Sequence, residues 1–245
     1  MTKTAEARRV NTTPIIALDV PTASAAMALV GELGETCGFY KVGNELFTAA
    51  GPSVVAAIRE QGREVFLDLK FHDIPNTVAG GVRNAAKLGA SLVTVHASGG
   101  AAMLRAAADA ARDAGGGSRV LAVTVLTSLS ADAVAEAWGR GASLDVEAEV
   151  LRLAEGAAEA GIDGVVCGGS EAGAVSQRFG DRLSILVPGV RAAGEGSQDQ
   201  ARVVTPREAA AAGARYVVVG RMVTGAPDRR QAMQAVTLEL GSGVA

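Results

Sequence analysis

Short apolar runs alternate with amphipathic segments along nearly the whole chain. Each run is rich in Val, Ile, Leu and Ala, and each is followed by a stretch whose apolar residues recur at helical spacing. Eight runs have the composition expected of buried strands. The predicted strands are Pro14–Asp19, Phe39–Val42, Glu64–Lys70, Leu92–His96, Arg119–Val125, Asp163–Cys167, Leu183–Pro188 and Arg215–Gly220.

Helices are predicted in the connections, and the first begins after a capping Thr22 or Ser24. Alternation of strands and helices produces parallel strands joined by right-handed crossovers. Eight such units in 245 residues predict an α/β fold, a single (β/α)8 TIM barrel. An open doubly wound sheet is the alternative. The later predicted helices are Glu45–Gln61, Thr77–Leu88, Ala101–Ala114, Ala131–Trp138, Val146–Ala160, Glu171–Phe179, Pro206–Ala212 and Asp228–Leu240.

Composition narrows the class of protein further. Hydrophobic residues make up 49% of the chain but aromatic residues only 3%, which suits a parallel sheet buried on both faces by small aliphatic side chains. No change in composition divides the chain, so one domain over residues 1–245 is predicted, with residues 1–12 as a loose N-terminal extension.

Charge and cysteine usage exclude several functions. The net charge is −3 without a basic block, which argues against nucleic-acid binding. Cys37 and Cys167 form neither a disulfide framework nor a zinc-binding spacing. Neither a signal peptide nor a membrane-spanning run is recognisable, so a cytoplasmic protein without membrane contact is expected.

The most informative chemistry follows the third predicted strand. Asp68 and Lys70 are two residues apart, so they point to the same face of a strand, and Asp73 lies in the connection that follows. Ligands of parallel α/β folds bind at this end of the strands. A solvated ion network is the plain alternative for such a cluster.

Other strand ends add polar residues to the same mouth. Asp19 and Lys41 belong to the first two strands, and Lys41, Asp68, Lys70 and Asp73 could pair as a chain of opposite charges. His96 is expected to be a satisfied core or rim histidine without a direct chemical role. The remaining candidates are Thr127, Gly189-Val190-Arg191 and Gly220-Arg221, of which the last two suit phosphate, with residues 189–202 as a possible lid.

A longer string surrounds the charged cluster of the third predicted strand, and it reads Phe66-Leu67-Asp68-Leu69-Lys70-Phe71-His72-Asp73-Ile74-Pro75-Asn76-Thr77. This string closely resembles the active-site signature of the orotidine 5′-monophosphate decarboxylase family. The resemblance covers nearly the whole chain. It implies a homodimeric barrel with shared active sites that converts orotidine 5′-monophosphate to UMP and carbon dioxide with no cofactor and no metal. The other similar motifs are Ala17-Leu18-Asp19-Val20, Lys41-Val42-Gly43, Thr94-Val95-His96-Ala97, Leu126-Thr127-Ser128, Pro188-Gly189-Val190-Arg191, Asp199-Gln200-x-Arg202 and Val218-Val219-Gly220-Arg221.

The resemblance assigns roles at the reacting end of the substrate. Lys70 would donate a proton to C6 of the pyrimidine, and Asp68 would lie beside the departing carboxylate. Lys41 and Asp19 would bind ribose hydroxyls, with Lys41 also part of the charged network. Thr127 would contact the base. Considered without the resemblance, no residue of the chain supplies an electron sink of the kind that a cofactor provides.

The resemblance also assigns the phosphate end and the subunit boundary. Gly220, Arg221 and Arg191 would hold the phosphate, Gln200 would bridge lid, base and phosphate, and Pro188 is counted among the substrate-binding positions. The residues that would reach the partner subunit's site are Asp73, Ile74 and Thr77.

Two positions depart from the family pattern, and both bear on local loop geometry. Met222 stands where the family often has proline, and Gly168 stands where it often has serine.

Two rival functions remain open. A 3-keto-gulonate phosphate decarboxylase or a hexulose phosphate synthase would share the D-x-K-x-x-D motif but act on a sugar phosphate through a metal-stabilised enediolate, so dependence on magnesium separates them. The Ile74-Pro75-Asn76-Thr77 continuation and Asp199-Gln200 favour the nucleotide enzyme. A non-catalytic barrel that binds nucleotide phosphates is the other alternative, but a mere binder would not need this chain of charges.

Overall fold

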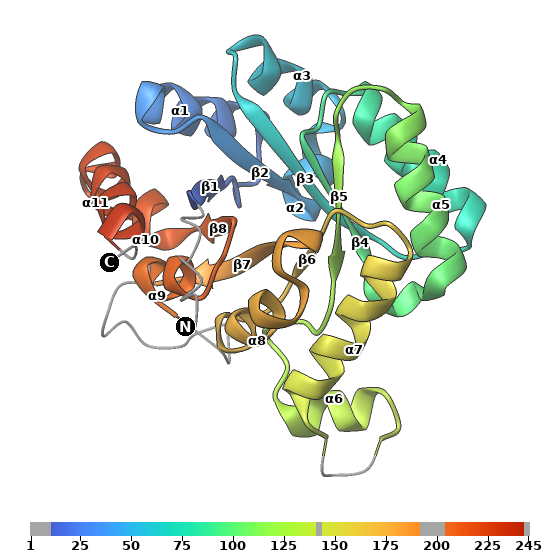
Figure 1. Ribbon diagram of the computed structural model, residues 1–245. Coiled ribbons are helices and arrows are strands. Elements are labelled where there is room, and N and C mark those ends of the chain that lie inside the picture. Colours follow the sequence, from blue (N-terminus) through green and yellow to red (C-terminus); the bar gives the residue numbers. More distant parts are fainter. Residues whose placement is uncertain (1–10, 141–143, 192–203, 243–245) are drawn as a thin grey trace, which may run out of the picture.

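The computed structural model describes residues 11–140, 144–191 and 204–242. Eight parallel strands form a closed barrel in which each strand lies beside its neighbours in the sequence and β8 pairs with β1 (Figure 1). The predicted barrel is confirmed and the open sheet is excluded. The strands are β1 Thr13–Ala17, β2 Phe39–Gly43, β3 Glu64–Phe71, β4 Leu92–His96, β5 Arg119–Val123, β6 Gly164–Val166, β7 Ser184–Val190 and β8 Tyr216–Val219.

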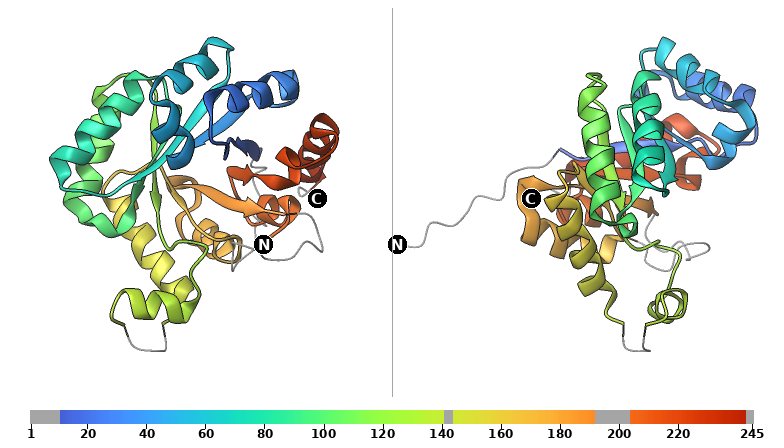
Figure 2. Two further views of the ribbon diagram at one scale, coloured as in Figure 1. Left: turned by 180° about the vertical axis from the view of Figure 1, so that it is seen from behind. Right: turned by 90° about the vertical axis from the view of Figure 1, so that its right-hand side faces the viewer.

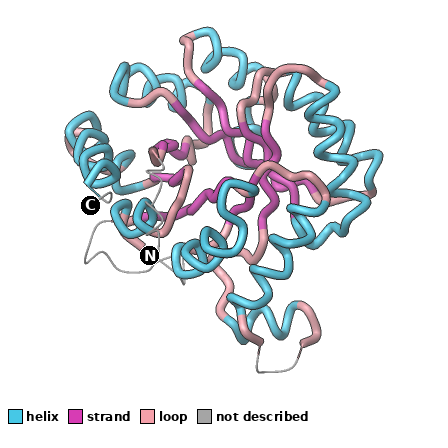
Figure 3. Tube along the Cα trace, viewed as in Figure 1, coloured by secondary structure: helices cyan, strands magenta, loops and turns pink. Residues whose placement is uncertain are grey.

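Helices surround the strands, as the secondary-structure colouring in Figure 3 makes clear. The short helix α6 projects away from the barrel (Figure 2). None of the described helices has the length and apolarity needed to cross a membrane. The α-helices are α1 Ala23–Leu33, α2 Asn44–Ala50, α3 Ser53–Glu60, α4 Pro75–Lys87, α5 Gly100–Asp113, α6 Ala131–Ala137, α7 Val146–Glu159, α8 Gly169–Phe179, α9 Pro206–Ala211, α10 Arg221–Thr224 and α11 Arg229–Ser242, with 3-10 turns at Gly34–Thr36, Ala97–Gly99 and Gly180–Arg182.

Some element boundaries differ from those predicted, for local reasons. The helical region expected over Glu45–Gln61 is two helices, because Gly51 adopts a positive φ of 65° at the end of α2 and Pro52 follows it. Helix α4 begins at Pro75 rather than Thr77, since the fixed φ of proline suits a first helical turn. The short α10 was not predicted. At the start of α1, Thr22 is the cap, and its side chain accepts a hydrogen bond from the Ala25 N–H.

The predicted N-terminal extension falls mostly on residues 1–10, outside the described residues. Thr12, the last residue of the predicted extension 1–12, is not loose. Thr12 is 7% exposed, and its hydroxyl donates to the Ala214 carbonyl at 2.7 Å. This bond ties the residue before β1 to the residues before β8 at the amino-terminal end of the barrel.

The apolar core has two layers. The larger one lies between strands and helices, and the smaller one fills the barrel interior. Because side chains alternate along a strand, each inward-facing residue is followed two positions later by another. Phe66 of the interior is thus followed by Asp68, Phe39 by Lys41, and Ala17 by Asp19. The alternation therefore carries charged side chains onto the interior axis at the carboxyl ends of the strands.

Candidate active site

A cavity of about 540 Å³ lies at the carboxyl ends of the strands. Its floor consists of residues of the interior core, among them Phe66, Val123 and Leu186. Its walls are polar and charged, and they include nine of the predicted site residues. These are Asp19, Lys41, Asp68, Lys70, Thr127, Pro188, Arg191, Gly220 and Arg221.

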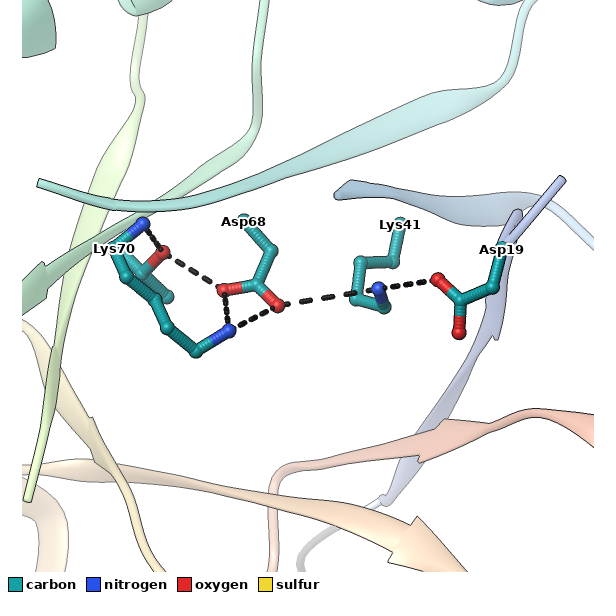
Figure 4. A network of polar contacts seen from close by, with 5 residues as sticks. Asp19, Lys41, Asp68 and Lys70 are labelled. Carbon is teal, nitrogen blue, oxygen red and sulfur yellow. Dashed lines mark hydrogen bonds and ion pairs between the residues drawn. The ribbon is translucent and has the colours of Figure 1, made fainter. Parts of the chain in front are cut away.

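Four of these side chains form a chain of alternating charge across the cavity wall (Figure 4). The Lys70 Nζ lies 2.9 and 2.8 Å from the two carboxylate oxygens of Asp68. The Lys41 Nζ lies 4.0 Å from Asp68 Oδ2 and donates to Asp19 Oδ1 at 2.9 Å. Lys41, Asp68 and Lys70 thus pair as predicted, and Asp19 extends the chain of charges at its Lys41 end. The predicted place of Asp73 beside Lys70 stays a prediction. One carboxylate is held between two ammonium groups.

Burial differs along this chain of charges. The Lys41 and Asp68 side chains are each 12% exposed, whereas Lys70 is 32% and Asp19 is 63% exposed. Gly43, at the end of β2, leaves room for the Lys41 ammonium, because a Cβ there would lie 3.0 Å from Nζ. Lys41 and Asp68 are therefore held in a partly dehydrated setting, where electrostatic interactions are stronger than in water.

The end of β3 is not a regular strand, although the sequence predicts one. Lys70 has a positive φ of 49°, in the left-handed region that side chains with a Cβ rarely occupy. Its backbone N–H donates to the Thr94 hydroxyl at 2.9 Å, and that hydroxyl donates to Asp68 Oδ1 at 2.9 Å. Strain of this kind is typical of functional sites.

The other side of the cavity is suited to an anion. Arg191 and Arg221 line it together with Gly220, and Gly189 adopts a positive φ of 68° where the β7–β8 register shifts. The Arg191 backbone N–H donates to the Val204 carbonyl at 3.1 Å. This bond joins the described ends of the connection between β7 and α9. Two guanidinium groups and glycine backbone are a common setting for phosphate.

The remaining predicted residues lie elsewhere. Asp73, Ile74 and Thr77 are exposed and do not line the cavity, and Ile74 is 66% exposed. The Asp73 carboxylate accepts from the Ile74 N–H at 2.6 Å. Gln200 lies outside the described residues. The expected role of the first three in a second subunit's site stays a prediction.

Sequence reasoning missed several residues of the site. Ser128, Met222 and Thr224 line the cavity, so the departure at Met222 falls on the cavity wall. Gly168, the other departure, precedes α8 with an ordinary φ of −67°. Thr94 is fully buried behind Asp68. The sequence could have indicated this position, because Thr94 lies two residues after the inward-facing Leu92 and therefore faces the barrel interior as well. Within the described residues, no three or more His, Cys, Asp or Glu side chains gather as a metal would require.

His96 stacks on His72 at the rim, with ring centroids 5.3 Å apart and planes 30° apart. Burial lowers the pKa of His96 below its ordinary value, and the neighbouring His72 and Lys70 lower it further against a weaker opposing effect of Asp68. The lowered pKa favours the neutral form of the His96 imidazole.

The chain is similar in sequence to a known family and to named proteins. The sequence model of the "Orotidine 5'-phosphate decarboxylase / HUMPS family" matches residues 12–236. A protein named orotidine 5′-phosphate decarboxylase from Anaeromyxobacter sp. (strain K) is 51% identical over 224 residues, covering 91% of this chain and 96% of its own length. One of the same name from Moorella thermoacetica is 47% identical over 231 residues, covering 92% and 91%.

A solved structure is similar over nearly its whole length. The crystal structure of orotidine 5′-phosphate decarboxylase from Lactobacillus acidophilus superposes with a TM-score of 0.82 at 36% identity, covering 94% of this chain and 99% of that one.

The lowered pKa of His96 predicts a dependence of stability on pH. Below the ordinary pKa of about 6.5 the unfolded chain binds a proton at this position more readily than the folded protein does, so the free energy of unfolding should fall as pH drops below that value. Urea unfolding at pH 7.5, 6.5 and 5.5 measures it. His96→Gln should flatten the dependence, while His72→Gln should keep most of it, because burial is the main cause. Equal slopes in wild type and His96→Gln would contradict this account.

Proposed function

We propose that this chain, which belongs to the orotidine 5′-phosphate decarboxylase / HUMPS family, converts orotidine 5′-phosphate to UMP and carbon dioxide, the last step of de novo pyrimidine nucleotide synthesis. The chain is thus a carboxy-lyase. The observation that carries the proposal is the Lys70 ammonium, fixed by Asp68 in the wall of a cavity whose floor is apolar.

The reaction leaves an electron pair on carbon. When the bond between C6 and the carboxylate breaks, carbon dioxide departs and both bonding electrons stay in an sp² orbital at C6. We infer that the Lys70 ammonium stabilises this charge and then gives C6 its proton, after which solvent reprotonates the amine. Asp68 would lie beside the departing carboxylate while holding Lys70 in place. Cofactor independence belongs to this proposal, since Lys70 takes the part of both charge stabiliser and acid.

The rest of the cavity supplies binding energy. Lys41 and Asp19 would bind the ribose hydroxyls, and Thr127 the pyrimidine. Arg221, Gly220 and Arg191 would hold the phosphate, and Gln200 would bridge base and phosphate. The phosphate lies far from C6, but its binding can still lower the barrier if it helps to close and order the site.

We further propose a homodimer with shared active sites. The segment from Asp73 to Thr77 is exposed next to Lys70 in the sequence, and it carries the apolar Ile74 side chain into solvent. An exposed isoleucine flanked by polar residues and the Asp73 carboxylate matches the apolar core and polar rim of a protein interface. Asp73, Ile74 and Thr77 would reach the partner's cavity. The cytoplasmic location expected from the sequence stays a prediction.

Turnover of orotidine 5′-phosphate in excess EDTA tests the proposed reaction. Absorbance should report conversion to UMP by the wild-type protein, because the mechanism uses no metal. Lys70→Ala should lower the rate by at least about 10²–10³-fold, as expected for loss of a preorganised charge at the reacting atom. Lys87→Ala removes an exposed lysine at the end of α4 and should leave the rate unchanged.

Two other results would point elsewhere. Magnesium-dependent activity on a sugar phosphate, without turnover of the nucleotide, would place the chain among the metal-dependent relatives. Inactivity on both substrates would support the non-catalytic binding barrel and make the charge chain structural.

Mixed dimers test the shared site. Lys70→Ala and Asp73→Ala proteins should each be nearly inactive alone. After co-refolding, one site of each heterodimer would combine an intact Lys70 with an intact Asp73 from the other subunit, so a substantial fraction of the activity should return. If activity stays at the level of the separate variants in a verified heterodimer, Asp73 does not act across the subunit boundary.

A further inference from the structure

We propose that Thr94 is a positioning residue for the decarboxylation: its hydroxyl holds the backbone of Lys70 and the carboxylate of Asp68 in one fixed relation. The inference rests on the proposed function and adds a residue that sequence reasoning did not place in the site. Thr94 lies in the middle of β4 and is fully buried.

The first support is an irregular pairing of β3 with β4. Leu67 pairs with Val93 and Phe71 pairs with Val95, so three residues of β3, numbers 68–70, stand opposite the single residue Thr94. Bulges of this kind interrupt backbone pairing and re-aim side chains, and they are common beside active sites. Here the bulge contains both Asp68 and Lys70.

The second support is the direction of the hydrogen bonds. The Lys70 backbone N–H can only donate, so the Thr94 hydroxyl must accept from it at 2.9 Å. The hydroxyl's single hydrogen then points to Asp68 Oδ1, also at 2.9 Å. One side chain therefore replaces the missing strand partner of Lys70 and orients the carboxylate that binds the Lys70 ammonium.

The third support is the conformation that this bond retains. Lys70 is the one described residue other than glycine with a positive φ, at 49°. Such a conformation persists only when surrounding contacts hold it in place. The Lys70 backbone N–H is bonded to the Thr94 hydroxyl, and the same residue carries the side chain that we assign to proton donation.

Thr94 acts on the reaction only through its neighbours. It has no exposed surface and does not line the cavity, so it would not touch the substrate. Removing its hydroxyl should therefore affect kcat through the placement of Lys70 and Asp68 and leave KM nearly unchanged. A residue needed only for folding would lower the stability without this separation of kcat from KM.

Thr94→Val tests the proposal, because it keeps the shape of the side chain and removes the hydroxyl. We expect kcat for orotidine 5′-phosphate to fall about 10- to 100-fold, as for loss of a hydrogen bond to a charged group, with KM within about twofold of wild type. Thr94→Ser should retain most of the activity. Thr12→Val removes a similarly buried hydroxyl at the opposite end of the barrel and should leave kcat unchanged.

If Thr94→Val does not fold, Thr94→Ser and Thr94→Ala make the same comparison, because they lack the same methyl group and differ only in the hydroxyl. Unchanged kcat in folded Thr94→Val, or equal kcat in the Ser and Ala variants, overturns the proposal.

A crystal structure of Thr94→Val separates this inference from the proposed function. We expect the Lys70 φ to leave the left-handed region or the contact of Lys70 Nζ with Asp68 to lengthen. A variant that keeps both unchanged overturns the role of Thr94, whatever reaction the wild-type protein catalyses. An inactive wild-type protein with the expected change in the variant structure would instead overturn only the proposed reaction.

Discussion

The site depends on one buried carboxylate held between two ammonium groups. Asp68 is 12% exposed, with Lys70 in contact at 2.8 Å and Lys41 at 4.0 Å. An uncompensated charge in such a setting is costly, and loss of one partner of a buried ion pair typically costs about 3–5 kcal/mol. Asp68 therefore needs its lysines, and they are fixed in turn by Asp68 and Asp19. A chain of charges that stabilises itself can stand ready before any substrate arrives.

The barrel provides this arrangement through the alternation of its strands. The interior residues Ala17, Phe39 and Phe66 form a dry apolar layer, and the next inward positions are Asp19, Lys41 and Asp68. A floor of low polarity strengthens the electrostatic interactions just above it. The same geometry places the ammonium groups on the side of β2 and β3 and the guanidinium groups after β7 and β8.

Much of this could be predicted from the sequence because it rests on short-range periodicity. A period of two places Asp68 and Lys70 on one face, and alternating strands and helices predict the barrel. The bulge at Asp68–Lys70 could not be predicted, because the residues that cause it interact across strands, 24 positions apart in the case of Lys70 and Thr94. Asp73, Ile74 and Thr77 illustrate a different limit, because the contact with a second subunit proposed for them would leave no periodic signal within one chain. Gln200 lies outside the described residues, so its assignment rests on the family motif.

Exchange of the C6 hydrogen of UMP in D₂O tests the central claim most directly. If the Lys70 ammonium protonates C6, the reverse step must let the Lys70 amine remove that hydrogen, so proton NMR should show its slow replacement by deuterium in the presence of wild-type protein. Lys87→Ala should behave in the same way, and Lys70→Ala should give no exchange above background. Exchange at the wild-type rate by folded, UMP-binding Lys70→Ala would mean that another group faces C6, and the account of this site would be wrong.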